Sequence, residues 1–104
     1  MSFTGIKYEY YPDGKLRSTC FECNGVREGE YLEYSSESEM TYFLNWYENC
    51  KTPYIEGKNL KTMCNYINGK IEGEYKMFWY DGKTLYLTCN YINGLREGES
   101  KMFY

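Results

Sequence analysis

Cysteine and carboxylate side chains are the groups of this 104-residue chain that could do chemistry, since it has five cysteines, 15 acidic residues and no histidine. Cys20, Cys64 and Cys89 come at matching places in three similar segments, and a row of thiols could bind a metal or act in redox chemistry. Free cysteine also behaves as a small apolar residue. Alternate strands of a sheet lie about 10 Å apart, beyond the reach of a disulfide. We therefore expect a ladder of small buried residues and no metal.

The remaining cysteine motif is a single Cys-x-x-Cys pair, Cys20 and Cys23. Structural zinc takes four sulfur or nitrogen ligands, and the chain offers neither a second such pair nor a histidine. We therefore predict no metal site and no cofactor. An odd cysteine count without an N-terminal signal peptide predicts an intracellular protein that is not secreted, either cytoplasmic or part of a virus particle.

Acidic residues gather in three Glu-Gly-Glu triplets, centred on Gly29, Gly73 and Gly98. Stacked carboxylates could bind a cation or a basic partner, and paired carboxylates could transfer protons inside a cleft. A flat sheet offers no cleft, and basic residues lie near each triplet, so we expect a solvated acidic face. Without histidine, Ser-His-Asp and Cys-His catalytic sites are also excluded. We therefore predict that the protein is not an enzyme.

Charge and hydropathy exclude further classes. The net charge of −3 argues against a nucleic-acid binder, which would carry a basic stripe. The mean hydropathy of −0.74 and the lack of a long apolar run exclude a transmembrane helix. Anionic membrane surfaces attract basic patches, so the acidic balance also argues against membrane binding.

A repeated sequence pattern indicates which elements position these groups. Three segments, beginning at Leu16, Leu60 and Leu85, share the pattern Leu-x-x-x-Cys-x-x-x-Asn-Gly-x-x-Glu-Gly-Glu. Asn-Gly between two runs of alternating apolar and polar residues is a strong signal for a β-hairpin. The glycines fixed by the pattern are Gly25, Gly29, Gly69, Gly73, Gly94 and Gly98.

The composition and spacing lead to one fold prediction. The chain has no alanine, and 20% of its residues are aromatic, which favours strands over helices. The first two segments are separated widely enough for a degraded hairpin, which residues 40–49 could form. We predict an all-β domain over residues 1–104, an elongated single-layer antiparallel meander of about four β-hairpin units. The units are residues 6–34, 35–55, 56–80 and 81–104.

The pattern resembles the MORN-repeat variant. The turn glycines match those of MORN units, and Tyr66 and Tyr91 stand near the place of the MORN tryptophan. Two departures are Glu22, which replaces the aromatic residue of the first unit, and the poor second unit. The resemblance implies an elongated β-sheet that serves as a scaffold or interaction module, and no catalytic residues. Variant arrays of this kind occur in bacterial proteins described as antitoxins and in large DNA viruses.

Aromatic side chains are the candidate partner surface. A single-layer sheet cannot bury both faces, and exposed tyrosine and tryptophan in a patch indicate a protein partner; cross-strand packing is the alternative. The candidate residues are Tyr42, Phe43, Trp46, Tyr47, Tyr75 and Trp79. Open edge strands also predict self-association.

We therefore expect a non-enzymatic protein-interaction or scaffold module, such as a component of a viral particle or other large assembly. Two alternatives stay open. One is a peripheral module that binds lipid headgroups, and the other is an antitoxin-like partner that neutralises an enzyme through its acidic face.

Overall fold

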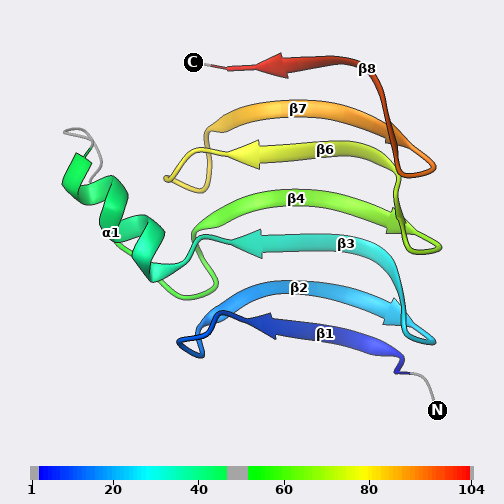
Figure 1. The fold of residues 1–104 in the computed structure, drawn as a ribbon, viewed down its shortest axis with the longest axis horizontal. Helices are drawn as coiled ribbons and strands as arrows, with labels where there is room; N and C mark the ends of the chain where they lie inside the picture. The colour runs from blue at the N-terminus through cyan, green and yellow to red at the C-terminus, as the bar shows by residue number, and fades with distance from the viewer. Residues whose placement is uncertain (1–2, 47–51, 104) are drawn as a thin grey trace.

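The computed structural model describes residues 3–46 and 52–103, with the side chains of residues 43–46 left out of the description. These residues form a mostly β protein built on one open antiparallel sheet of eight strands (Figure 1). The spatial order is β1-β2-β3-β4-β6-β7-β8, and the short β5 pairs with β4 ahead of β6. The strands are β1 (Gly5–Tyr10), β2 (Leu16–Cys23), β3 (Val26–Tyr34), β4 (Leu60–Ile67), β5 (Lys70–Ile71), β6 (Gly73–Phe78), β7 (Leu85–Ile92) and β8 (Leu95–Met102).

The three Asn-Gly pairs all form hairpin turns, as the sequence predicts. Asn68 has a φ of 51° and Gly69 a φ of 79°, and the turns at residues 24–25 and 93–94 differ from these values by no more than 2°. Positive φ at both central residues is typical of the type I′ turn, whose twist matches that of the flanking strands. All three turns lie at the same end of the sheet (Figure 1).

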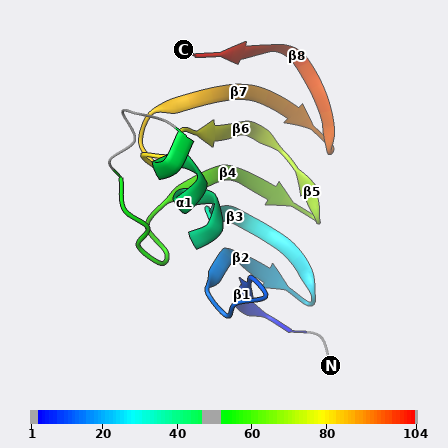
Figure 2. The same cartoon turned by 60° about the vertical axis from the view of Figure 1, so that its left-hand side comes forward.

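An α-helix replaces the expected second hairpin unit. Helix α1 (Glu37–Trp46) follows β3 and lies at the strand ends opposite the Asn-Gly turns (Figures 1 and 2). Ser36 and Glu39 form a capping box: the Glu39 N–H donates to Ser36 Oγ at 3.0 Å, and the Ser36 N–H donates to Glu39 Oε1 at 3.2 Å. The prediction of a hairpin over 35–55 is therefore wrong, and the fold is not purely β.

The insertion between β3 and β4 that contains α1 is closed by the same kind of backbone hydrogen bond as the short turns at that end of the sheet. The Ser35 N–H donates to the Asn59 carbonyl at 2.8 Å, just as the Trp79 N–H donates to the Thr84 carbonyl at 2.9 Å between β6 and β7. The described part of the chain thus has three Asn-Gly hairpins preceded by β1, rather than four hairpins. Its long axis follows the strands and α1, and the molecule measures 46 × 35 × 17 Å (Figure 1).

One face of the sheet holds most of the buried side chains. In cross-strand register, Cys20 lies opposite Tyr31, Tyr31 opposite Cys64, and Tyr75 opposite Cys89. We call this the buried face. Its buried residues are Ser18, Cys20, Glu22, Tyr31, Thr62, Cys64 and Cys89. Small residues alternate with large rings, so the rings cover the thiols without a second layer.

Candidate functional site

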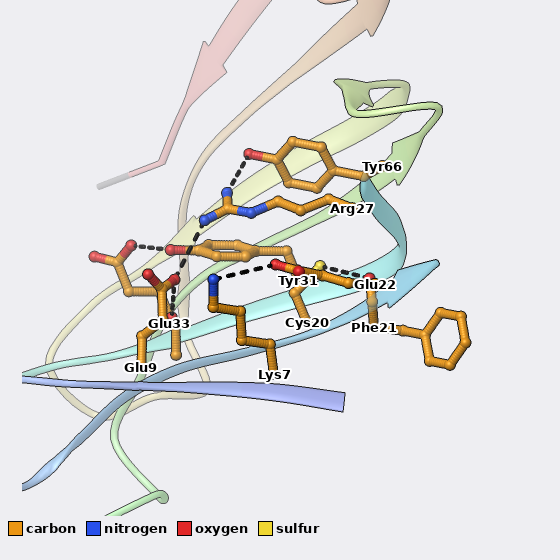
Figure 3. Close-up of polar contacts among 10 residues, drawn as sticks. Lys7, Glu9, Cys20, Phe21, Glu22, Arg27, Tyr31, Glu33 and Tyr66 are labelled. Atoms are coloured by element: carbon orange, nitrogen blue, oxygen red, sulfur yellow. Dashed lines mark hydrogen bonds and ion pairs between the residues drawn. The ribbon is translucent and has the colours of Figure 1, made fainter. Parts of the chain in front are cut away.

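The buried face has its largest cluster of polar contacts around Arg27, near the start of β3 (Figure 3). The Arg27 guanidinium lies 5.0 Å from the ring centroid of Tyr31 and 5.1 Å from that of Tyr66. It donates to the Tyr66 hydroxyl at 3.0 Å and to a Glu9 carboxylate oxygen at 3.2 Å. One planar side chain thus joins β1, β3 and β4, which is the geometry that arginine favours over lysine.

Carboxylates complete the cluster around Arg27. The Tyr31 hydroxyl donates to Glu33 at 2.7 Å, and burial together with this carboxylate raises the pKa of Tyr31. The buried Glu22 lies 3.8 Å from Lys7. Charges on this face are therefore paired with one another, as buried charges must be. Sequence reasoning did not identify Arg27, whose partners on β1 and β4 are far away in the chain.

The cysteines lie as predicted for small buried residues. Cys20, Cys64 and Cys89 are 5%, 3% and 5% exposed, and Cys23 is exposed. Burial raises the pKa of the Cys64 thiol to about 11 and also raises the pKa of Cys20. The thiols of Cys20 and Cys64 are therefore protonated and weakly nucleophilic near neutral pH. Among the described residues, no group of three Cys, Asp or Glu side chains could hold a metal ion.

The described members of the predicted aromatic surface have different surroundings. Tyr75 packs against the buried cluster, with its ring centroid 5.7 Å from that of Tyr91. Tyr42 on α1 is 54% exposed. Phe43 and Trp46 belong to α1, but their side chains lie outside the description, and Tyr47 lies outside the described residues. The role of these residues in partner binding stays a prediction.

Trp79, the remaining candidate, lies beside α1. Its ring centroid is 4.7 Å from that of Tyr86, in an edge-to-face arrangement. On α1, Glu39 forms an ion pair with Lys61 of β4 at 3.1 Å. A hollow between the strand ends and α1 is lined by Ser35, Glu39, Lys61, Met77, Phe78, Trp79, Tyr80 and Tyr86. The contact with Tyr86 gives Trp79 a packing role, and its part in partner binding stays a prediction.

The Glu-Gly-Glu triplets have a role that the sequence did not indicate. The Asn68 N–H donates to the Glu28 carboxylate at 2.7 Å, and the Gly69 N–H donates to the Arg27 carbonyl at 3.0 Å. We call such a carbonyl and the side-chain oxygen of the next residue an acceptor pair. The other two turns donate to acceptor pairs in the same way. In the first turn, the Asn24 N–H donates to Thr4 Oγ1 at 3.0 Å and the Gly25 N–H to the Phe3 carbonyl at 2.7 Å. In the third turn, the Asn93 N–H donates to Glu72 at 2.7 Å and the Gly94 N–H to the Ile71 carbonyl at 2.9 Å.

Each acceptor pair binds the turn that follows it in the sheet. Glu28 and Glu72 are thus fixed to backbone amides, which corrects the expectation that the triplets are only a solvated face. A carboxylate that accepts an N–H forms a stronger hydrogen bond than a neutral group does. The regular spacing of the first glutamate of each triplet was the available signal.

Comparisons with protein-family models, with curated proteins and with solved structures find no match to this chain. The MORN resemblance therefore stays a prediction. Within residues 3–46 and 52–103, no helix has both the length and the apolar character needed to cross a membrane.

Proposed function

We propose that this chain is a non-enzymatic protein-interaction or scaffold module of the MORN-variant type, which associates through the open edges of its sheet. The observation that carries the proposal is the position of β1 and β8 as the two outermost strands. An outermost strand has a row of backbone donors and acceptors that face away from the sheet, and these pair readily with another chain.

Exposed apolar side chains near both edges support the proposal. On β1, Ile6, Tyr8 and Tyr10 are 55%, 52% and 58% exposed. Around β8, Leu95 is 67% exposed and Met102 is 47% exposed. Proteins usually protect their edges with charges, proline or a covering element. Both edge strands also carry charges, such as Arg96 and Glu97 on β8, but the apolar side chains beside them are typical of surfaces that associate.

The register of the three hairpins supports the repeat assignment. At each Asn-Gly turn the second cross-strand pair joins the residue two before the asparagine to the residue two after the glycine. These pairs are Glu22 with Arg27, Tyr66 with Ile71, and Tyr91 with Arg96. The same acceptor pairs link successive turns, which is expected of an array in which each unit stacks on the one before it.

Sedimentation velocity over a wide concentration range tests the proposal. We expect the wild-type chain to associate as its concentration rises, and Met102→Pro to reduce that association. The Phe103 N–H donates inward to the Tyr86 carbonyl, so by alternation the Met102 N–H faces outward, and proline removes that donor.

The matched control is Met102→Ala, which removes the side chain but keeps the N–H. It separates the loss of apolar surface from the loss of edge pairing. A wild-type chain that stays monomeric at every concentration would count against association through the edges.

A further inference from the structure

The last strand of the sheet carries an acceptor pair of its own. Arg96 pairs with Tyr91 across the third hairpin, in the register that Ile71 has with Tyr66. Glu97 follows Arg96, as Glu72 follows Ile71. The Ile71 carbonyl and the Glu72 carboxylate both face the next turn. The same backbone register directs the Arg96 carbonyl away from β7 and places Glu97 where its carboxylate could reach a turn bound there.

No described strand lies beyond β8, so no turn of the described chain reaches this acceptor pair. Arg96 and Glu97 are both exposed, whereas Glu28 and Glu72, which accept turn amides, are half-buried. The two acceptors of β8 are therefore the same kinds of group as the internal acceptor pairs, but no turn amides of the described residues donate to them.

We propose that β8 binds a β-hairpin of another polypeptide that is closed by an Asn-Gly turn. The Glu97 carboxylate would accept the asparagine N–H of that turn, and the Arg96 carbonyl would accept the glycine N–H. The internal contacts give the expected geometry, since Glu72 and Ile71 accept the same two amides at 2.7 and 2.9 Å. The inference rests on the proposed function and assigns β8 its partner.

A second copy of this chain does not supply the required turn. Its three Asn-Gly turns already donate both amides to Phe3 and Thr4, to Arg27 and Glu28, and to Ile71 and Glu72. Release of Phe3 and Thr4 would free the first turn, but β8 could pair with β2 of that hairpin only if β1 left the sheet. That would break the ion pair of Glu9 with Arg27 at 3.2 Å and the contact of Lys7 with the buried Glu22. The turn that fills this acceptor pair therefore belongs to a different polypeptide, and self-association of this chain would pair its edge strands without such a turn.

A cyclic hairpin peptide tests this assignment. The probe has the sequence of residues 60–79 with Cys64→Ser, closed through its ends so that the hairpin is kept. The matched control peptide has D-proline at position 68, which keeps the tight turn but has no N–H for Glu97 to bind. Both peptides are titrated by calorimetry against the wild-type chain and against Glu97→Gln, whose substitution lies on the exposed edge.

We expect the first peptide to bind the wild-type chain and to bind Glu97→Gln about tenfold more weakly, since the charged acceptor becomes a neutral amide oxygen that accepts a weaker hydrogen bond. The D-proline peptide should bind both chains equally and with the lower affinity. Equal binding of the first peptide to both chains, or no binding to the wild-type chain, overturns the inference. Concentration-dependent association in sedimentation with no effect of Glu97 would leave the proposed function standing without this partner.

Discussion

Replacing Arg27 by methionine should lower the stability of the sheet more than any other single change in a half-exposed charged residue. The guanidinium contacts two tyrosine rings, each contact contributing about 0.5–1 kcal/mol. Its hydrogen bond to Tyr66 adds about 1 kcal/mol. The ion pair with Glu9, whose side chains are 34% and 40% exposed, adds less than about 1 kcal/mol. Methionine keeps part of the packing, so we expect a net loss of about 2 kcal/mol.

The chain offers a matched control, because Arg96 has the register position of Arg27 but lies exposed on the edge strand. Arg96→Met should change stability by less than about 0.5 kcal/mol. For a domain of this size, Arg27→Met should lower Tm by roughly 8–16 °C. Arg27→Lys should fall between wild type and Arg27→Met, because an ammonium keeps the charge but cannot reach Tyr66 and Glu9 together.

Thermal and urea unfolding followed by far-ultraviolet circular dichroism would measure all four proteins. An unchanged urea m-value would show that the variants differ in stability and not in the extent of the sheet. If Arg27→Met and Arg96→Met lower Tm equally, the stack of Arg27 between two rings does not stabilise the sheet and the reasoning fails.

Three further outcomes are expected. Glu72→Gln should reduce the free energy of unfolding by about 1 kcal/mol while Glu97→Gln leaves it nearly unchanged, as measured by urea unfolding, because of these two residues Glu72 alone accepts a described turn amide. Mass-spectrometric mapping of thiol labelling at pH 8 should find Cys23 modified well before Cys64, because Cys64 is buried and its pKa is raised to about 11. Burial favours the neutral form of Glu39, but hydrogen bonds from Ser36 and Lys61 outweigh this effect and lower the pKa of Glu39. The wild-type chain should therefore be more stable than Glu39→Gln at pH values above the pKa of an unfolded glutamate. This advantage should be lost as the pH falls through the lowered pKa of the folded state.

The hairpins could be predicted from the sequence because their cause is local. Asparagine and glycine both accept positive φ, and the alternation on each side assigns the faces. The cysteine positions followed from the same alternation. Local chemistry also marked helix α1, since Ser36-x-x-Glu39 is a capping-box pattern. The prediction followed the spacing of the repeats, which left room for a degraded hairpin, and did not take this cap into account.

The stack around Arg27 and the acceptor pairs could not be predicted in the same way. Tyr66 is 39 residues from Arg27, and Asn68 is 40 residues from Glu28. These contacts depend on which strands are neighbours in the sheet. Because the insertion of α1 separates β3 from β4 in the sequence, the spacing of the repeats does not show that these two strands pair. Thr4-Gly5, at the start of β1, was a weaker signal, because threonine stands where the other acceptor pairs have glutamate.

The acceptor pairs also explain why the two ends of the strands differ. At the Asn-Gly end each turn is bound to the strand before it, so an insertion there would separate amides from their acceptors. At the other end Ser35 and Asn59 close the base of the insertion with one backbone hydrogen bond, as short turns do. Helix α1 therefore stands where added length leaves the sheet unchanged. The acceptor pairs at the turn end thus determine how successive hairpins stack. At the edge of the sheet, Glu97 on β8 repeats the position of the internal glutamates, and α1 covers neither edge strand.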